Sequence, residues 1–127
     1  MLRPIKTFFR KLKPFDRRKD NRFPLHFYLQ CVCVYTQAGQ RQEVQSHIKN
    51  ISKGGLLITT SETTIHPGKE VEIRFQLSHQ EEMHSIHGKV LRSYRKDYSS
   101  WHYLAIQFHN REEESVKLLL AFASKES

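Results

Sequence analysis

Residues 25 to 36 alternate between large or apolar side chains and polar ones. The odd positions of this segment are leucine, phenylalanine, cysteine or tyrosine, whereas several even positions are polar (His26, Gln30, Thr36). A period of two places the apolar groups on one face of an extended chain. The pattern therefore predicts a strand with one face buried and one in water.

Further β-prone segments follow at short intervals. The clearest alternation lies at residues 71–77, and weaker patterns lie at residues 43–51, 56–59, 86–90 and 104–108. Ala38 and Gly39 predict one turn, and His66 to Gly68 predict another. Five or six short strands joined by polar turns favour an antiparallel barrel or sandwich, and closure into a barrel would leave no exposed strand edge.

The carboxyl-terminal segment has a different period. Apolar residues recur there at i, i+3, i+4 and i+7 (Val116, Leu119, Leu120, Ala123), which predicts a helix. Asn110 is the expected N-cap, with Glu113 three residues later as in a capping box. We expect this short helix to plug or flank the barrel.

The basic residues are concentrated at the amino end. The chain of 127 residues has the length of one domain and a net charge of +8. Residues 1–24 hold nine basic and two acidic residues, whereas residues 25–127 hold twelve and eleven. Within residues 1–15, apolar side chains also recur at helical spacing between the basic ones. This basic amphipathic arm predicts an anionic partner, and residues 1–14 could meet an acidic membrane surface.

Composition argues against several other functions. Cys31 and Cys33 are the only cysteines, and their i, i+2 spacing in a strand suits two buried thiols better than a disulfide. The eight histidines show no metal-ligand spacing with them, so no metal site is expected. No catalytic set or cofactor motif stands out, and we expect a protein without enzymatic activity. The absence of a signal sequence or apolar span predicts a cytoplasmic location, with peripheral attachment at the inner membrane as an extension of it.

Two short motifs carry the candidate chemistry. The segment RRKDNR contains Arg17, Arg18 and Arg22, and NISKGG contains the other three candidates (Asn50, Ser52, Gly55). A guanidinium group can pair with phosphate oxygens or with guanine O6 and N7, and its flat face can stack on a purine. Asn50 and Ser52 are expected on one face of an extended segment, while Gly55 would allow close backbone approach.

These motifs, in this order and separation, resemble the PilZ domain, the bacterial receptor module for cyclic di-GMP. The resemblance covers roughly residues 16–122 and includes IKNISKGGLLI, PGKEVEIRFQL, IHGKVLRSY and YLAIQF. It implies an all-β fold with one helix, a six-stranded antiparallel barrel with a carboxy-terminal α-helix. The predicted organisation is an arm at residues 1–15 and a PilZ domain at residues 16–124.

The resemblance also implies the site. Arg18 and Arg22 would clamp the phosphates and guanines of cyclic di-GMP, and Asn50, Ser52 and Gly55 would line the barrel wall beneath one guanine. Arg17, directly before the RxxxR motif, suggests that the ligand binds as an intercalated dimer. The expected output is a change in the arm that signals to an unidentified downstream protein.

Two residues depart from the family pattern. Asn50 stands where the family often has aspartate, and this change should weaken a guanine contact. Ala105 stands where many members have glycine, and this change should matter little.

A small basic barrel could instead bind RNA or single-stranded DNA, with bases stacked on Tyr98, Trp101 or Tyr103. The concentration of basic residues in the arm argues against nucleic acid. The third hypothesis is a peripheral membrane adaptor anchored by the arm.

Overall fold

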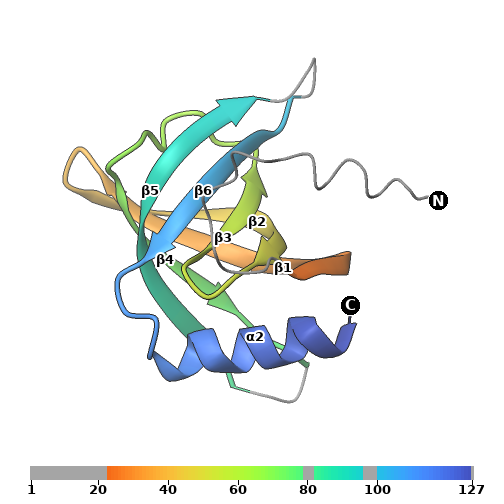
Figure 1. Cartoon of the computed structure of the whole chain (residues 1–127). Coiled ribbons are helices and arrows are strands. Elements are labelled where there is room, and N and C mark those ends of the chain that lie inside the picture. The colour runs from red at the N-terminus through yellow and green to blue at the C-terminus, as the bar shows by residue number, and fades with distance from the viewer. Residues whose placement is uncertain (1–22, 79–81, 96–99, 127) are drawn as a thin grey trace, which may run out of the picture.

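The computed structural model describes residues 23–78, 82–95 and 100–126, which form six strands and one helix. The strands are β1 (Phe23–Gln37), β2 (Gln40–Ile51), β3 (Gly55–Thr60), β4 (Glu70–Phe75), β5 (His84–Arg95) and β6 (His102–Phe108). They are antiparallel and close into a barrel in the order β1-β2-β3-β6-β5-β4 (Figure 1). The helix, α2 (Glu114–Glu126), ends the described chain. The predicted six-stranded barrel with a carboxy-terminal helix is confirmed.

The turns have the backbone geometry that their residues favour. Ala38 and Gly39 join β1 to β2, and both have positive φ angles, of 54° and 79°. Two successive positive φ angles are typical of the tight turns that match the twist of a hairpin. Gly68, with φ of 94°, lies in the second predicted turn, which is closed by a bond from the Lys69 amide to the His66 carbonyl oxygen.

β2 contains an irregularity that hides its strand pattern in the sequence. Ile48 pairs with Ile58 and Asn50 pairs with Leu57, so Lys49 is an extra residue in β2 relative to β3. Such a bulge changes the phase of alternation along the strand. As a result, Ile48 and Ile51 both point inward although they are three residues apart, and both are fully buried.

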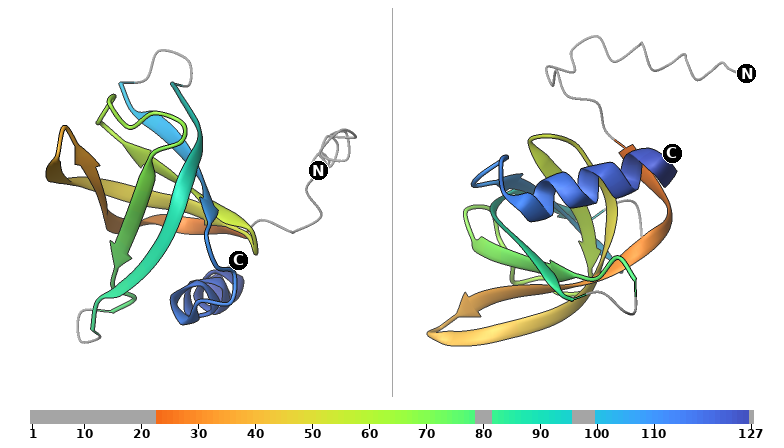
Figure 2. Two further views of the ribbon diagram at one scale, coloured as in Figure 1. Left: turned by 90° about the vertical axis from the view of Figure 1, so that its left-hand side faces the viewer. Right: turned by 90° about the horizontal axis from the view of Figure 1, so that it is seen from below.

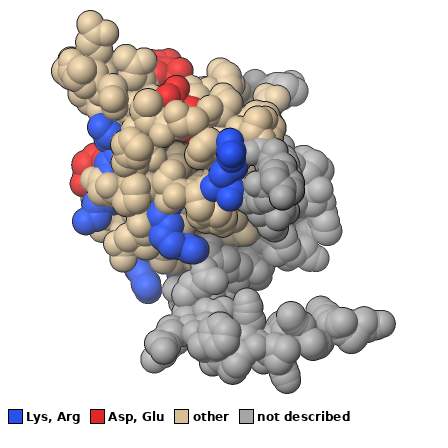
Figure 3. Space-filling model, turned by 90° about the horizontal axis from the view of Figure 1, so that it is seen from above, with Lys and Arg blue, Asp and Glu red and all other residues tan. Residues whose placement is uncertain are grey.

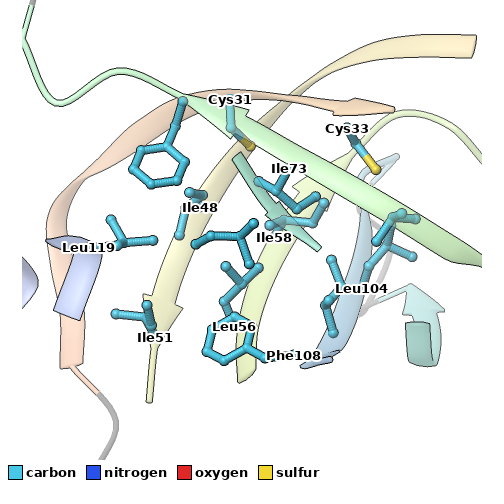
Figure 4. Packing of buried hydrophobic residues seen from close by; sticks show 14 of the residues in the cluster. Cys31, Cys33, Ile48, Ile51, Leu56, Ile58, Ile73, Leu104, Phe108 and Leu119 are labelled. Carbon is cyan, nitrogen blue, oxygen red and sulfur yellow. The ribbon is translucent and has the colours of Figure 1, made fainter. Parts of the chain in front are cut away.

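The barrel interior is filled by apolar side chains from all six strands, Phe108 among them (Figure 4). Cys31 and Cys33 also belong to this core as free thiols, as the sequence predicted. Burial raises the pKa of both thiols, that of Cys33 to about 12. Thiolates are therefore scarce at neutral pH, and both cysteines behave as small apolar residues.

α2 lies across one end of the barrel (Figure 2). Its buried side chains include the predicted stripe members Val116, Leu119 and Ala123. The predicted N-cap was wrong, because the helix begins at Glu114. Asn110 instead accepts a bond from the Glu112 amide within the preceding turn, and the Glu113 carbonyl oxygen accepts the first bonds of the helix.

Candidate functional site

The NISKGG motif forms a tight turn between β2 and β3. The Ser52 amide donates to the Gly55 carbonyl oxygen at 2.9 Å, and the Ser52 hydroxyl approaches the same oxygen at 3.4 Å. The Phe108 amide donates to the Gly54 carbonyl oxygen at 3.0 Å, which ties the turn to the end of β6. The backbone of the motif is therefore held from both sides.

Ser52 does not continue the extended segment, contrary to the prediction. β2 ends at Ile51, and Ser52 is buried within the turn. Asn50 is half-buried one residue before the inward-pointing Ile51, so it faces the outside of the barrel. The two side chains thus differ in setting: the amide lies at the surface, and the hydroxyl supports the turn.

Gly55 is required by a close approach between strands. A Cβ atom at this position would lie 2.2 Å from the Ile106 carbonyl oxygen of β6. The backbone of Gly55 needs no positive φ angle. The structure thus gives this glycine a packing role, and contact with a ligand stays a prediction.

A row of outward-facing residues crosses four strands beside the turn. Asn50 of β2 pairs with Leu57 of β3, Leu57 pairs with Ala105 of β6, and Ala105 pairs with Arg92 of β5. The neighbours of Leu57 and Ala105 along their own strands point into the core, so these two side chains face outward. The row forms a shallow outer wall with an amide at one end and a guanidinium at the other.

The predicted arginines Arg17, Arg18 and Arg22 lie outside the described residues. The chain that carries them nevertheless joins the barrel at the motif, because Phe23, the residue after Arg22, pairs with Ile51. Arg18 is five residues from Phe23, and an extended chain spans at most about 3.6 Å per residue. The chain length alone therefore limits the distance from Arg17, the farthest of the three, to Phe23 to at most roughly 22 Å.

Charge is distributed unevenly around the barrel. In the view of Figure 3, Lys and Arg side chains are spread over the face, while Asp and Glu lie near its margins. A hollow of about 970 Å³ among the described residues lies elsewhere, against β1, β4 and the start of β5. It is lined by residues that include His66, His87 and His109, and by none of the motif residues. The candidate site is therefore an open wall rather than a pocket.

Within residues 23–78, 82–95 and 100–126, no group of three or more His, Cys, Asp or Glu side chains is placed to hold a metal ion. The one described helix is neither long nor apolar enough to cross a membrane.

The described chain is thus a closed antiparallel barrel with one end helix and a braced NISKGG turn. The family model of the PilZ domain matches residues 16–125, and the chain belongs to that family. No curated protein matches the chain.

Solved structures share the fold at low sequence identity. The PilZ domain of YcgR from Escherichia coli, determined with c-di-GMP, is similar with a TM-score of 0.66 and 15% identity, covering 87% of this chain and 92% of that one. The Bacillus subtilis inhibitor of motility MotI/DgrA gives a TM-score of 0.62 and 17% identity, over 87% and 51%. The MrkH–c-di-GMP complex of K. pneumonia gives 0.59 and 19%, over 88% and 56%. This chain thus spans about half the length of the last two.

Sequence reasoning missed part of the outer wall. Leu57 and Arg92 attracted no attention, because a β-prone leucine and a strand arginine have no motif of their own. Their position depends on the pairing of β3 with β6 and of β6 with β5. Leu57 lies within the apolar run of residues 56–58, so no alternation in the sequence marks it as outward-facing.

Proposed function

We propose that this protein is a receptor for cyclic di-GMP that acts by binding and has no catalytic activity. The observation that carries the proposal is the pairing of Phe23 with Ile51, which joins the RRKDNR segment to the barrel beside the NISKGG turn. Between Arg22 and Asn50 lie 27 residues of sequence, and this pairing allows the two motifs to act on one ligand. Membership of the PilZ family supports this choice of ligand.

In this proposal the two motifs divide the work. Arg18 and Arg22 supply bidentate contacts to phosphate or guanine and a flat stacking surface. Asn50 offers an amide at the wall, while Ser52 and Gly55 hold the turn in shape. Arg17 supplies a further guanidinium for a second, intercalated ligand molecule. The receptor would work in the cytoplasm, where its signal passes to a protein partner.

Isothermal titration of cyclic di-GMP into the full chain tests this function. We expect micromolar or tighter binding, no comparable heat with GTP or cyclic di-AMP, and at least tenfold weaker binding by Arg18→Ala. Arg41→Ala is the matched control, because it removes one positive charge from an exposed residue of the β1–β2 hairpin. Two ligands per chain would support the intercalated dimer, and one would contradict it.

The control separates specific recognition from general attraction to a basic chain. Equal losses in Arg18→Ala and Arg41→Ala would show that charge alone drives binding. A folded wild-type chain that gives no heat would reject the receptor function.

We further propose that the ligand orders the arm at residues 1–15. Charge neutralisation at the arginines and ordering of the adjoining chain would then occur together. Hydrogen exchange on ligand saturation should slow across residues 1–22. Unchanged exchange there, with ligand bound, would contradict the arm as the output.

A further inference from the structure

A second group of side chains lies on the outer wall, one row away from the row that contains Asn50. Tyr94 of β5 and Tyr103 of β6 are cross-strand partners, and Thr59 and His47 continue the row onto β3 and β2. Trp101 lies just before β6. We call this group of six residues the aromatic face. It consists of four rings (His47, Tyr94, Trp101, Tyr103) and two flanking cations (Lys49, Arg92).

The aromatic rings of this face are arranged against one another and against cations. The rings of Tyr94 and Tyr103 are stacked, with centroids 5.4 Å apart and an interplanar angle of 12°. The Lys49 Nζ lies 5.2 Å from the centroid of the Tyr103 ring, and the Arg92 Cζ lies 5.3 Å from that of Tyr94. Cations at this distance are held by the ring quadrupole. Each tyrosine of the stacked pair therefore has its own cation close to its ring.

Trp101 extends the face and is open to solvent. Its side chain is 41% exposed, which is high for the largest apolar side chain in the chain. It packs against His47 at nearly a right angle, with centroids 5.9 Å apart. In the core this tryptophan would be explained by burial, but at this position it is a surface aromatic beside two others.

The parts of the strands beneath the aromatic face carry no acidic residue. The segments 45–51 of β2, 55–60 of β3, 89–95 of β5 and 102–108 of β6 contain no Asp or Glu, while they contain Lys49, Lys89, Arg92 and Arg95. The net formal charge of these described segments is therefore positive. An anionic partner fits this charge.

The side chains favour a nucleic acid over a protein as that partner. A protein interface usually has an apolar centre. Here the outward-facing aliphatic residues beside the aromatic rings are few, chiefly the half-buried Leu57 and the exposed Leu91. Surface aromatics interspersed with cations on a β-sheet are typical of surfaces that bind single-stranded nucleic acids, where bases stack and phosphates pair with Lys or Arg.

We propose that the aromatic face binds single-stranded nucleic acid. Bases stack on Trp101 and on the tyrosine pair, and Lys49 and Arg92 move from the ring faces to phosphate oxygens. This surface changes the view that the sequence alone supported, in which basic residues were concentrated in the arm. The proposal does not depend on cyclic di-GMP, since Tyr94 and Tyr103 belong to neither signature motif.

Binding of short fluorescent oligothymidylate and oligouridylate to the full chain tests the proposal by anisotropy. We expect Tyr94→Ala and Tyr103→Ala each to weaken binding by about fivefold or more, because stacking contributes about 1–3 kcal/mol per base. Tyr94→Phe and Tyr103→Phe keep the ring and should bind as the wild type does. Trp101 is the single tryptophan, so its fluorescence should be quenched when a base stacks on it.

A charge-matched pair of variants separates this face from the basic arm. Arg92→Ala should lower the slope of log K against log salt by about 0.7, the value for one phosphate contact on a single strand. Arg74→Ala, on β4, removes the same charge outside the aromatic face and should leave the slope near the wild-type value. If the arm alone bound the oligonucleotide, the affinity and the salt slope would be the same in all variants.

Three results would overturn the proposal. They are no oligonucleotide binding by the folded chain, full binding by Tyr94→Ala and Tyr103→Ala, and equal effects of Arg92→Ala and Arg74→Ala. A duplex that binds as tightly as the single strand would overturn the stacking. Thermal melting of each variant verifies folding, and cyclic di-GMP titration of the two tyrosine variants reports the other site separately.

Discussion

Gly55 shows how a residue of a binding motif can be fixed by packing alone. Its missing side chain leaves room for the Ile106 carbonyl oxygen of the neighbouring strand. The same holds for Gly88, where a Cβ atom would lie 2.4 Å from the Gln107 carbonyl oxygen. β6 is thus flanked on both sides by a glycine in the adjoining strand.

Replacement of Gly55 by alanine should destabilise the fold before any ligand is considered. The added Cβ meets backbone rather than a flexible side chain, so β3 or β6 must shift. We expect a loss of about 1–3 kcal/mol in the free energy of unfolding, the usual range for overpacking. Urea unfolding followed by circular dichroism measures it.

Two variants serve as comparisons for Gly55→Ala. Gly88→Ala should cost a similar amount, and Ser61→Ala, at an exposed position just after β3, should cost little. A Gly55→Ala protein as stable as the wild type would show that the two strands separate easily.

At the level of elements, local pattern was sufficient where a strand is regular. Val71, Ile73 and Phe75 alternate without interruption, and β4 formed where residues 71–77 predicted it, although it ends at Phe75. In β2 the bulge at Lys49 breaks the period, so the alternation is weak although the strand has twelve residues. β5 likewise extends well beyond Val90, across the irregularity between Val90 and Arg92.

Part of the candidate site could be predicted from the sequence, and part could not. Asn50, Ser52 and Gly55 could be proposed as candidates because a motif has a fixed order. The contact of Tyr94 with Tyr103 could not, because it depends on the register between β5 and β6 across a loop. Trp101 and Tyr103 were recognised as aromatics that could stack, but only the structure shows that Trp101 is exposed. Tyr98 lies outside the described residues.

α2 completes the core at one end of the barrel, and one of its side chains can test this. Leu119 is fully buried against the strands. Leu119→Ala should lower the free energy of unfolding by about 2–5 kcal/mol, because it removes buried methyl groups and leaves a cavity. Chemical denaturation provides the measurement.

The control for Leu119→Ala lies two residues away on the same helix. Lys117 is exposed and forms a surface ion pair with Glu112 at 3.1 Å. Lys117→Ala should change stability by less than about 1 kcal/mol. Equal effects of the two substitutions would mean that the helix is not part of the core.

Across the whole molecule, polar contacts on the outside connect three elements. The Arg74 Nε donates to Glu72 at 3.3 Å, and His87 lies 4.0 Å from Glu72. The same His87 is 3.0 Å from Glu113, the residue just before α2. Burial raises the pKa of Glu72, but hydrogen bonds from Ser85 and Arg74 and the positive charges nearby outweigh it. The net pKa of Glu72 is therefore lower than its usual value.

This shift predicts how the barrel responds to acid. A carboxyl group with a lowered pKa in the folded state stabilises the fold above its unfolded pKa, and this contribution is lost as the pH falls through the lower folded value. Wild type should exceed Glu72→Gln in unfolding free energy near neutral pH, by less than about 1 kcal/mol. The difference should begin to shrink as the pH falls below the usual glutamate pKa of about 4.3 and should vanish once the pH is below the lower folded pKa.

Urea unfolding of both proteins across this pH range measures the difference. Glu43→Gln is a suitable comparison, since Glu43 is also paired with an arginine but is exposed on the hairpin. A difference for Glu72→Gln that widens with acid would contradict the lowered pKa.

The closed ring of described strands has a mechanical consequence. Each strand is hydrogen-bonded on both sides, so none can shift without breaking two ladders at once. The sheet therefore resists gradual deformation and serves as a fixed frame for whatever is attached to it. Because the ring closes on itself, segments attached at its ends could be exchanged by protein engineers without opening the barrel.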